Sequence, residues 1–241
     1  MAPSSSPPRI LEARARHRVV VSYAVDPDRV VPHLPSGLTP DIRNGRAFVS
    51  LVGVELVRVR VLGLPGPGFR RVPAVELQVP VQEVGANRRG TTTVQAFVPR
   101  RLVAWGARSL YGESVSVASM QPVWKEQADS IQLTYRFDWA GREQRVRAVG
   151  TKPPVTPAPE TPASFLLDRG WRFGARTNGS VVRARSERPV EPIYRVREHH
   201  VTIQWASVYG KEWGFLSEVD PVAVLLTPGA PLTLYWREVV T

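Results

Sequence analysis

Arginine alternates with valine in three separate segments of this chain, at Arg58-Val59-Arg60, Arg145-Val146-Arg147 and Arg195-Val196-Arg197. Side chains two residues apart on a β-strand share one face of the sheet, so this spacing places valine inward and arginine in water. The pattern predicts strands with one buried and one solvated face.

Short β-branched segments bounded by turn residues repeat this signal along the chain. We expect strands over 18–25, 48–62, 72–84, 91–98, 114–124, 131–139, 142–150, 193–205, 220–226 and 232–239, and a hairpin over Asn178-Gly179. Helices are expected over 28–33, 99–112 and 161–169. Gly53 is predicted to mark a bulge in its strand. Many short strands with about three helices favour an antiparallel barrel or a highly curved sheet.

Two proline-rich segments bear on domain organisation. Residues 1–8 are rich in Pro and Ser and are expected to form a disordered tail. Residues 152–162 would suit an interdomain linker, but neither side of this segment looks able to fold alone. We therefore predict one domain over 9–241, with a surface loop at 152–162.

Composition indicates a soluble, cytoplasmic protein without a membrane partner. No stretch approaches the roughly 18 apolar residues that a membrane span needs, and the N-terminus lacks the apolar segment of a signal peptide. The chain has no cysteine, which excludes disulfide frameworks, thiolate nucleophiles and cysteine zinc sites.

The formal net charge of +11 suggests nucleic acid or an anionic surface as a partner. Of the 32 basic residues, however, 29 are arginines, and they are spread along the chain instead of gathered in one stripe. This distribution is typical of a solvated sheet face and argues against nucleic-acid binding.

The usual catalytic and cofactor motifs are missing from the sequence. No GxSxG, GxGxxG or P-loop pattern occurs, so no cofactor is predicted. His199 and His200 are adjacent, and neighbours on a strand point to opposite faces. We expect one of them buried and one exposed, and we predict no metal site.

Two carboxylates lie within apolar strand segments, where an unpaired charge is costly. Glu55 is expected to face solvent. Glu76 alternates with Gln78 on one face of its strand, with valine and leucine on the other. The polar face is either solvated or turned to a hydrated barrel lumen, and the sequence leaves both open.

Six segments carry a family resemblance: Gly45–Val54, the strand around Glu76, Ala107–Tyr111, Ser119-Met120, Phe165–Phe173 and His199–Trp205. Their order and spacing resemble the YqjF-like family of uncharacterised bacterial proteins (domain of unknown function 2071), which is grouped by fold with acetoacetate decarboxylase. The resemblance implies a mainly β fold: a cone-shaped, mostly antiparallel β-barrel with a few outer helices and a ligand-sized cavity.

The resemblance also implies a site. In acetoacetate decarboxylase the cavity holds an arginine, a glutamate and a lysine pair, one lysine forming a Schiff base with substrate. By strand order, Arg16 falls near that arginine, Glu76 near the glutamate, and Arg108 on the arginine that precedes the lysines. The lysine positions fall on Val115 and Ser116, which cannot form an imine.

Lys125 is the nearest alternative amine in the sequence. It stands beside Glu126 and is expected to be a charged surface residue, not a desolvated nucleophile. We therefore reject Schiff-base decarboxylation.

Three functions compete on this basis. The leading hypothesis is a barrel that binds a small carboxylate-bearing or weakly polar metabolite in its interior. Its predicted ligand-binding residues are Arg16, Glu76, Arg108 and Ser116, because a guanidinium pairs bidentately with a carboxylate. The alternative is an enzyme that uses Glu76 as general acid or base on an enolisable oxo compound. Nucleic-acid or anionic-surface binding rests on charge alone, and a homo-oligomer is compatible with all three.

Overall fold

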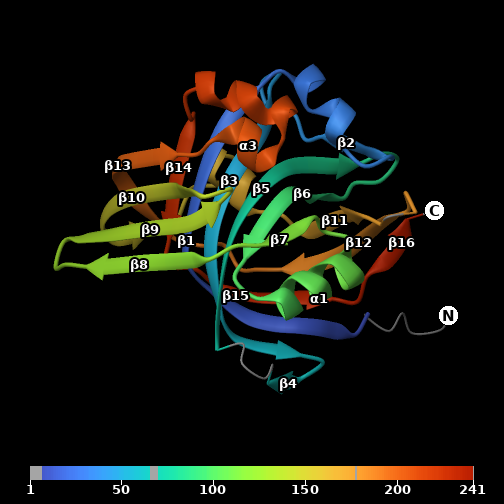
Figure 1. Ribbon diagram of the computed structural model, residues 1–241, viewed down its shortest axis with the longest axis horizontal. Helices are drawn as coiled ribbons and strands as arrows, with labels where there is room; N and C mark the ends of the chain where they lie inside the picture. Colours follow the sequence, from blue (N-terminus) through green and yellow to red (C-terminus); the bar gives the residue numbers. More distant parts are fainter. Residues whose placement is uncertain (1–6, 66–69, 177, 241) are drawn as a thin grey trace.

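The chain forms a closed ring of seven strands, each hydrogen-bonded to the next (Figure 1). The computed structural model describes residues 7–65, 70–176 and 178–240. In ring order the strands are β1 (Arg9–Val25), β3 (Ala47–Val61), β5 (Arg71–Glu83), β6 (Arg89–Val98), β11 (Trp171–Ala175), β12 (Val181–Glu187) and β15 (Pro231–Tyr235). β15 pairs with β1 and closes the ring. Because β6 and β11 pair in parallel and the other ring pairs are antiparallel, the predicted mainly β, mostly antiparallel barrel is confirmed.

A second sheet branches from the barrel at β1. It runs through β14 (Ala223–Thr227), β13 (Ile193–Thr202), β10 (Arg142–Val155), β9 (Ser130–Trp139) and β8 (Met120–Glu126). The short strands β2 (Leu38–Pro40), β4 (Leu64–Pro65), β7 (Val115–Val117) and β16 (Glu238–Val240) pair with β5, β3, β6 and β12. The predicted hairpin over Asn178-Gly179 is confirmed, since it joins the antiparallel strands β11 and β12.

Helices cover the barrel from more than one side, with α1 and α3 on opposite sides in Figure 1. α1 (Arg101–Tyr111) ends as predicted at Gly112, which adopts the left-handed conformation with φ 63°. α2 (Pro162–Leu167) begins after Thr161, whose hydroxyl accepts a hydrogen bond from the Ser164 N–H. The helix predicted over 28–33 is instead two 3₁₀ turns, η1 (Pro27–Arg29) and η2 (Val31–His33).

The predicted strand over 193–205 ends early, and two helical segments follow it. These are α3 (Trp205–Tyr209) and η3 (Lys211–Glu218). They bury Trp205, Tyr209 and Trp213 in the main core, and this packing of large aromatic residues favours a helical segment over a longer strand. Among the described residues, no helix is long and apolar enough to cross a membrane.

The proline-rich segments differ in part from expectation. Residues 1–6 of the predicted disordered tail lie outside the described residues, and β1 begins at Arg9. The surface loop predicted at 152–162 is wrong for its first four residues, because β10 continues to Val155. Pro153 and Pro154 fall where the β10–β13 pairing is irregular, a position that tolerates residues without an N–H group.

The main apolar core lies outside the barrel, between its wall and the second sheet. On β5, Val75, Leu77 and Val79 are fully buried in this core. Because side chains alternate along a strand, Glu76 and Gln78 belong to the opposite face, which turns to the barrel lumen.

Two smaller apolar clusters bound the lumen. One contains Val52 of the barrel and Phe165 of α2, and the other contains Val54 of the barrel and Ala104 of α1. One end of the lumen therefore lies near α2 and the other near α1, and the polar residues of the lumen lie between them.

Gly53 has a different role from the predicted bulge. The register of β1 and β3 shifts between Arg16 and Val19, so the extra residue belongs to β1. A Cβ atom at Gly53 would lie 2.5 Å from the Tyr135 ring of β9. The glycine therefore permits the close approach of the barrel and the second sheet.

Candidate functional site

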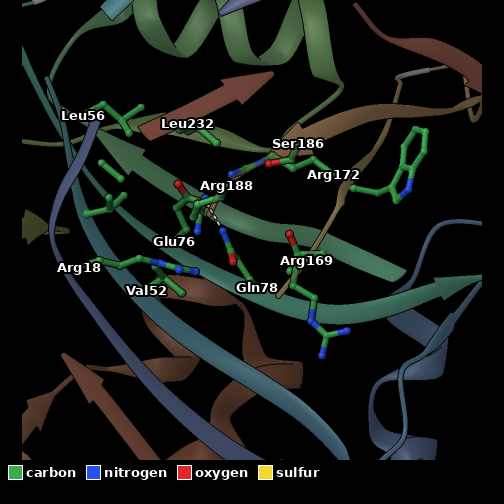
Figure 2. A pocket seen from close by; sticks show the side chains of 14 residues that line it. Arg18, Val52, Leu56, Glu76, Gln78, Arg169, Arg172, Ser186, Arg188 and Leu232 are labelled. Carbon is green, nitrogen blue, oxygen red and sulfur yellow. Dashed lines mark hydrogen bonds and ion pairs between the residues drawn. The ribbon is translucent and has the colours of Figure 1, made fainter. Parts of the chain in front are cut away.

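A polar cavity of about 50 Å³ lies in the barrel lumen, enclosed by side chains from several ring strands (Figure 2). Its lining includes four arginines, Arg18, Arg169, Arg172 and Arg188, and Gln78. Of the described lining residues, Glu76 is the one carboxylate. The polar face of β5, which the sequence left open, therefore faces a lumen and not the outer surface.

Arg172 pairs with two carboxylates, of which Glu76 lines this lumen. Its Nε donates to Glu113 Oε1 at 2.7 Å, and one Nη donates to Glu76 Oε2 at 3.0 Å. Gln78 donates a further hydrogen bond to Glu76. Glu76 belongs to β5, Arg172 to β11 and Glu113 to the segment before β7, so three distant parts of the chain meet here.

The two carboxyl groups differ in their affinity for a proton. Burial raises the pKa of Glu113, and the negative charge of Glu76 acts in the same direction. Together they outweigh the positive charge of Arg172, which acts to lower this pKa. Burial also acts on Glu76, but the Arg172 charge and the hydrogen bond from Gln78 hold its pKa below the usual range. Such a pair can keep a proton on one carboxyl while the other stays ionised.

Arg18 and Arg188 share one carboxylate, Glu191. Arg18 Nη1 lies 3.0 Å and Arg188 Nη1 lies 3.4 Å from the same Oε1 atom of Glu191, and Thr227 donates to the other oxygen. The Glu191 side chain is 1% exposed. Burial and then the charge of Arg18 lower the pKa of Arg188 to about 9. Two guanidinium groups at one carboxylate leave an excess of positive charge.

Several arginine N–H groups beside the cavity have no acceptor in the described part of the chain. These are Nε of Arg188 and Nε and one Nη of Arg169, all buried. The other Nη of Arg169 pairs with Asp41, and its guanidinium lies 4.2 Å from the centre of the Phe165 ring. Buried donors of this kind usually have partners, so an acceptor in the cavity would satisfy them.

A family model for uncharacterized conserved proteins, DUF2071, matches residues 12–231. The chain belongs to the DUF2071 family. No curated protein sequence gives a match.

Solved structures show the same fold for this DUF2071 protein. An acetoacetate decarboxylase-like enzyme from Sphingomonas wittichii RW1 is similar with a TM-score of 0.69 and 12% identity, over 97% of this chain and 93% of that one. Acetoacetate decarboxylase from Legionella pneumophila gives a TM-score of 0.67 and 14% identity, over 100% of this chain and 92% of the decarboxylase chain. The enduracididine biosynthesis enzyme MppR, complexed with pyruvate, is similar with a TM-score of 0.66 and 16% identity, over 100% of this chain and 93% of the MppR chain.

Of the four ligand-binding residues predicted for this DUF2071 protein, Glu76 lines the cavity, and Arg16, Arg108 and Ser116 are not among the described lining residues. The register of β1 shifts between Arg16 and Val19, and Arg18, which lies within this shift, lines the lumen instead of Arg16. Arg108 is exposed on α1 and donates through Nε to the Val115 carbonyl oxygen at 2.7 Å. Ser116 is half-buried in β7.

Lys125 is exposed on β8, as predicted. None of the three lysines of this DUF2071 chain, all within the described residues, belongs to the cavity lining. The lining therefore offers no amine for an imine.

Two other expectations are wrong. Glu55 is 4% exposed, not solvated, because it lies between His17 Nδ1 at 4.0 Å and Arg71 Nε at 3.6 Å. His199 and His200 are both exposed, although Val196 and Val201 of the same strand pack against the main core. Among the described residues, no group of three or more His, Cys, Asp or Glu side chains could hold a metal ion.

Sequence reasoning missed Arg18, Arg172, Arg188, Glu113 and Glu191. A usable signal existed for two of them. Arg172 stands between two aromatic residues, and Arg18 opens a run of valines, so each is a charge within an apolar strand like Glu76.

Proposed function

We propose that this barrel binds a small carboxylate in its interior cavity, with Arg18 and Arg188 as anion contacts and Glu76 orienting the ligand. The observation that carries the proposal is the single Glu191 carboxylate shared by two guanidinium groups. A ligand carboxylate would accept from the unpartnered Arg188 Nε and balance the excess positive charge.

Cavity size and fold support the same ligand class. One water needs roughly 10–15 Å³ of such a cavity. A cavity of about 50 Å³ therefore has room for only a few atoms of that size, which suits an acid of about two or three carbons. MppR, a protein of this fold, is complexed with pyruvate.

A surface groove offers a route to the cavity. The groove has a volume of about 540 Å³ and shares Trp171, Ser186 and Arg188 with the cavity lining. The Arg188 side chain is 18% exposed, so it stands at the boundary between the two spaces. An anion that reaches the groove would meet Arg185 at the surface and Arg188 at the boundary with the cavity.

Pyruvate is the probe that tests binding, measured by calorimetry at constant ionic strength. We expect Arg188→Gln to weaken pyruvate binding at least about tenfold, or about 1.4 kcal/mol. The matched control is Arg108→Gln, which removes an arginine outside the cavity and should leave the affinity unchanged. Equal affinity in wild type and Arg188→Gln, or equal binding of neutral acetone, would contradict the proposal.

The Glu76 and Glu113 pair favours a second candidate function, general acid–base chemistry on an enolisable acid. An ionised Glu76 could take a proton from the carbon beside a carbonyl group. Because a protonated Glu113 does not neutralise Arg172, the positive charge of Arg172 could then stabilise the negative charge that develops on the substrate. We expect the protein to accelerate deuterium exchange at the pyruvate methyl group, followed by NMR, and Glu76→Gln to abolish the acceleration. Exchange that equals the buffer rate, or that survives Glu76→Gln, would remove Glu76 from such chemistry.

A further inference from the structure

A second and larger pocket, of about 460 Å³, lies between α1 and the barrel strands. Its walls are apolar, with contributions from Val72, Ala96, Val98, Leu110 and Leu234. Leu56, Glu76, Arg172 and Leu232 line both this pocket and the polar cavity, so the two spaces are neighbours. A volume of this order is typical of sites for small organic molecules, which span roughly 300–1,000 Å³.

Large apolar side chains remain exposed around this pocket. Leu64 is 71%, Leu102 56% and Trp105 64% exposed, and all three belong to the lining. Single exposed apolar residues are common, but several converging on one concave site mark a binding surface. Trp105 of α1 therefore lies at the pocket and not in the core.

The polar groups of the pocket come together around Arg172. Glu76, Glu113 and Arg172 line it and are paired with one another. Tyr111 also lines it and is 8% exposed, and its Oη atom is buried with no hydrogen-bond partner among the described residues. A buried hydroxyl without a partner is uncommon, so Tyr111 Oη is the group in this lining to which a ligand oxygen would add a hydrogen bond.

The charges of these groups select a neutral ligand. Arg172 is already paired with Glu76 and Glu113, so a carboxylate or an ammonium group finds no free counter-charge among these three side chains. A neutral oxygen needs no counter-charge and can pair with the Tyr111 hydroxyl.

We propose that the pocket under α1 binds an apolar molecule of about ten non-hydrogen atoms with one neutral oxygen function, a ketone or an alcohol, whose oxygen hydrogen-bonds to Tyr111 Oη. This site shares Glu76 and Arg172 with the proposed carboxylate cavity, but its proposed occupant does not require that the cavity bind a carboxylate. The apolar walls hold the hydrocarbon part, and Tyr111 orients the oxygen end.

The test uses 2-octanone as the probe, with binding followed by tryptophan fluorescence and by calorimetry. Gly106 lines the pocket, and a Cβ atom there meets nothing within 4 Å, so Gly106→Leu can occupy the space while favouring the helix. We expect Gly106→Leu to weaken 2-octanone binding at least about tenfold and Tyr111→Phe about fivefold. Ser109→Leu is the control, because it adds the same side chain to an exposed position of α1 outside the pocket.

Three results would overturn the proposal. The first is 2-octanone binding that is absent in the wild type or unchanged in Gly106→Leu. The second is octanoate binding tighter than 2-octanone and lost in Arg188→Gln, which would assign the pocket to the tail of an acid held in the cavity. The third is a concentration-dependent dimer that Gly106→Leu dissociates, which would assign the surface to a second copy of the chain.

Discussion

Replacing Arg172 with leucine is expected to lower the free energy of unfolding by about 3–5 kcal/mol at pH 7. The substitution leaves Glu76 and Glu113 buried without their shared guanidinium, and each side chain is 11% exposed. Urea denaturation followed by tryptophan fluorescence measures the loss. Arg185→Leu is the matched control on the neighbouring strand β12, because its ion pair with Glu187 is exposed and should contribute under about 1 kcal/mol.

The pH dependence distinguishes lost charge pairing from lost packing. Without Arg172, the main effect that opposes burial is lost, and only the Gln78 hydrogen bond and the Arg18 charge still act to lower the pKa of Glu76. We therefore expect the pKa of both carboxyls in the folded state to lie above the unfolded value. The folded state then binds more protons than the unfolded state, so the stability of Arg172→Leu should rise as the pH falls from 7 toward 5. Adding Glu76→Gln and Glu113→Gln should recover much of the loss. A pH-independent loss equal to that of the control would contradict the charge-pairing account.

The fold was largely predictable because its determinants are local. The alternation of valine with Arg58 and Arg60 correctly placed valine inward and arginine outward on β3. Gly112 correctly ended α1. The errors arose where tertiary packing outweighs local pattern, as in α3, whose Trp205 is buried in the main core, and in β10, which continues through Pro153 and Pro154.

The site was less predictable because its contacts join distant segments. Arg18 and Glu191 are 173 positions apart and Arg172 and Glu76 are 96 apart, so no spacing rule connects them. A single extra residue in β1 makes Arg18 line the cavity in place of Arg16. Sequence order can identify a strand, but one bulge changes which of its side chains face the lumen.

Replacing Glu191 with glutamine is expected to lower the free energy of unfolding by about 3 kcal/mol at pH 7. The change leaves Arg18 and Arg188 facing each other without a negative partner. Although burial acts to raise the pKa of Glu191, the charges of Arg18 and Arg188 hold it below the usual value. Its contribution is therefore present above the unfolded pKa and is lost as the pH falls through the folded value, so the difference from wild type should shrink in acid.

The same variant links stability to ligand binding. A carboxylate that enters the cavity of Glu191→Gln would replace the missing charge, so pyruvate should stabilise this variant more than wild type. At a hundred times its dissociation constant, pyruvate would stabilise the variant by about 2.7 kcal/mol in total. Chloride at equal ionic strength is the control, because general screening affects both proteins alike. If pyruvate stabilised the two proteins equally, or neither, Arg18 and Arg188 would be a structural ion cluster and not an anion site. Selective stabilisation would show that the excess positive charge of the lumen is the feature that a ligand completes.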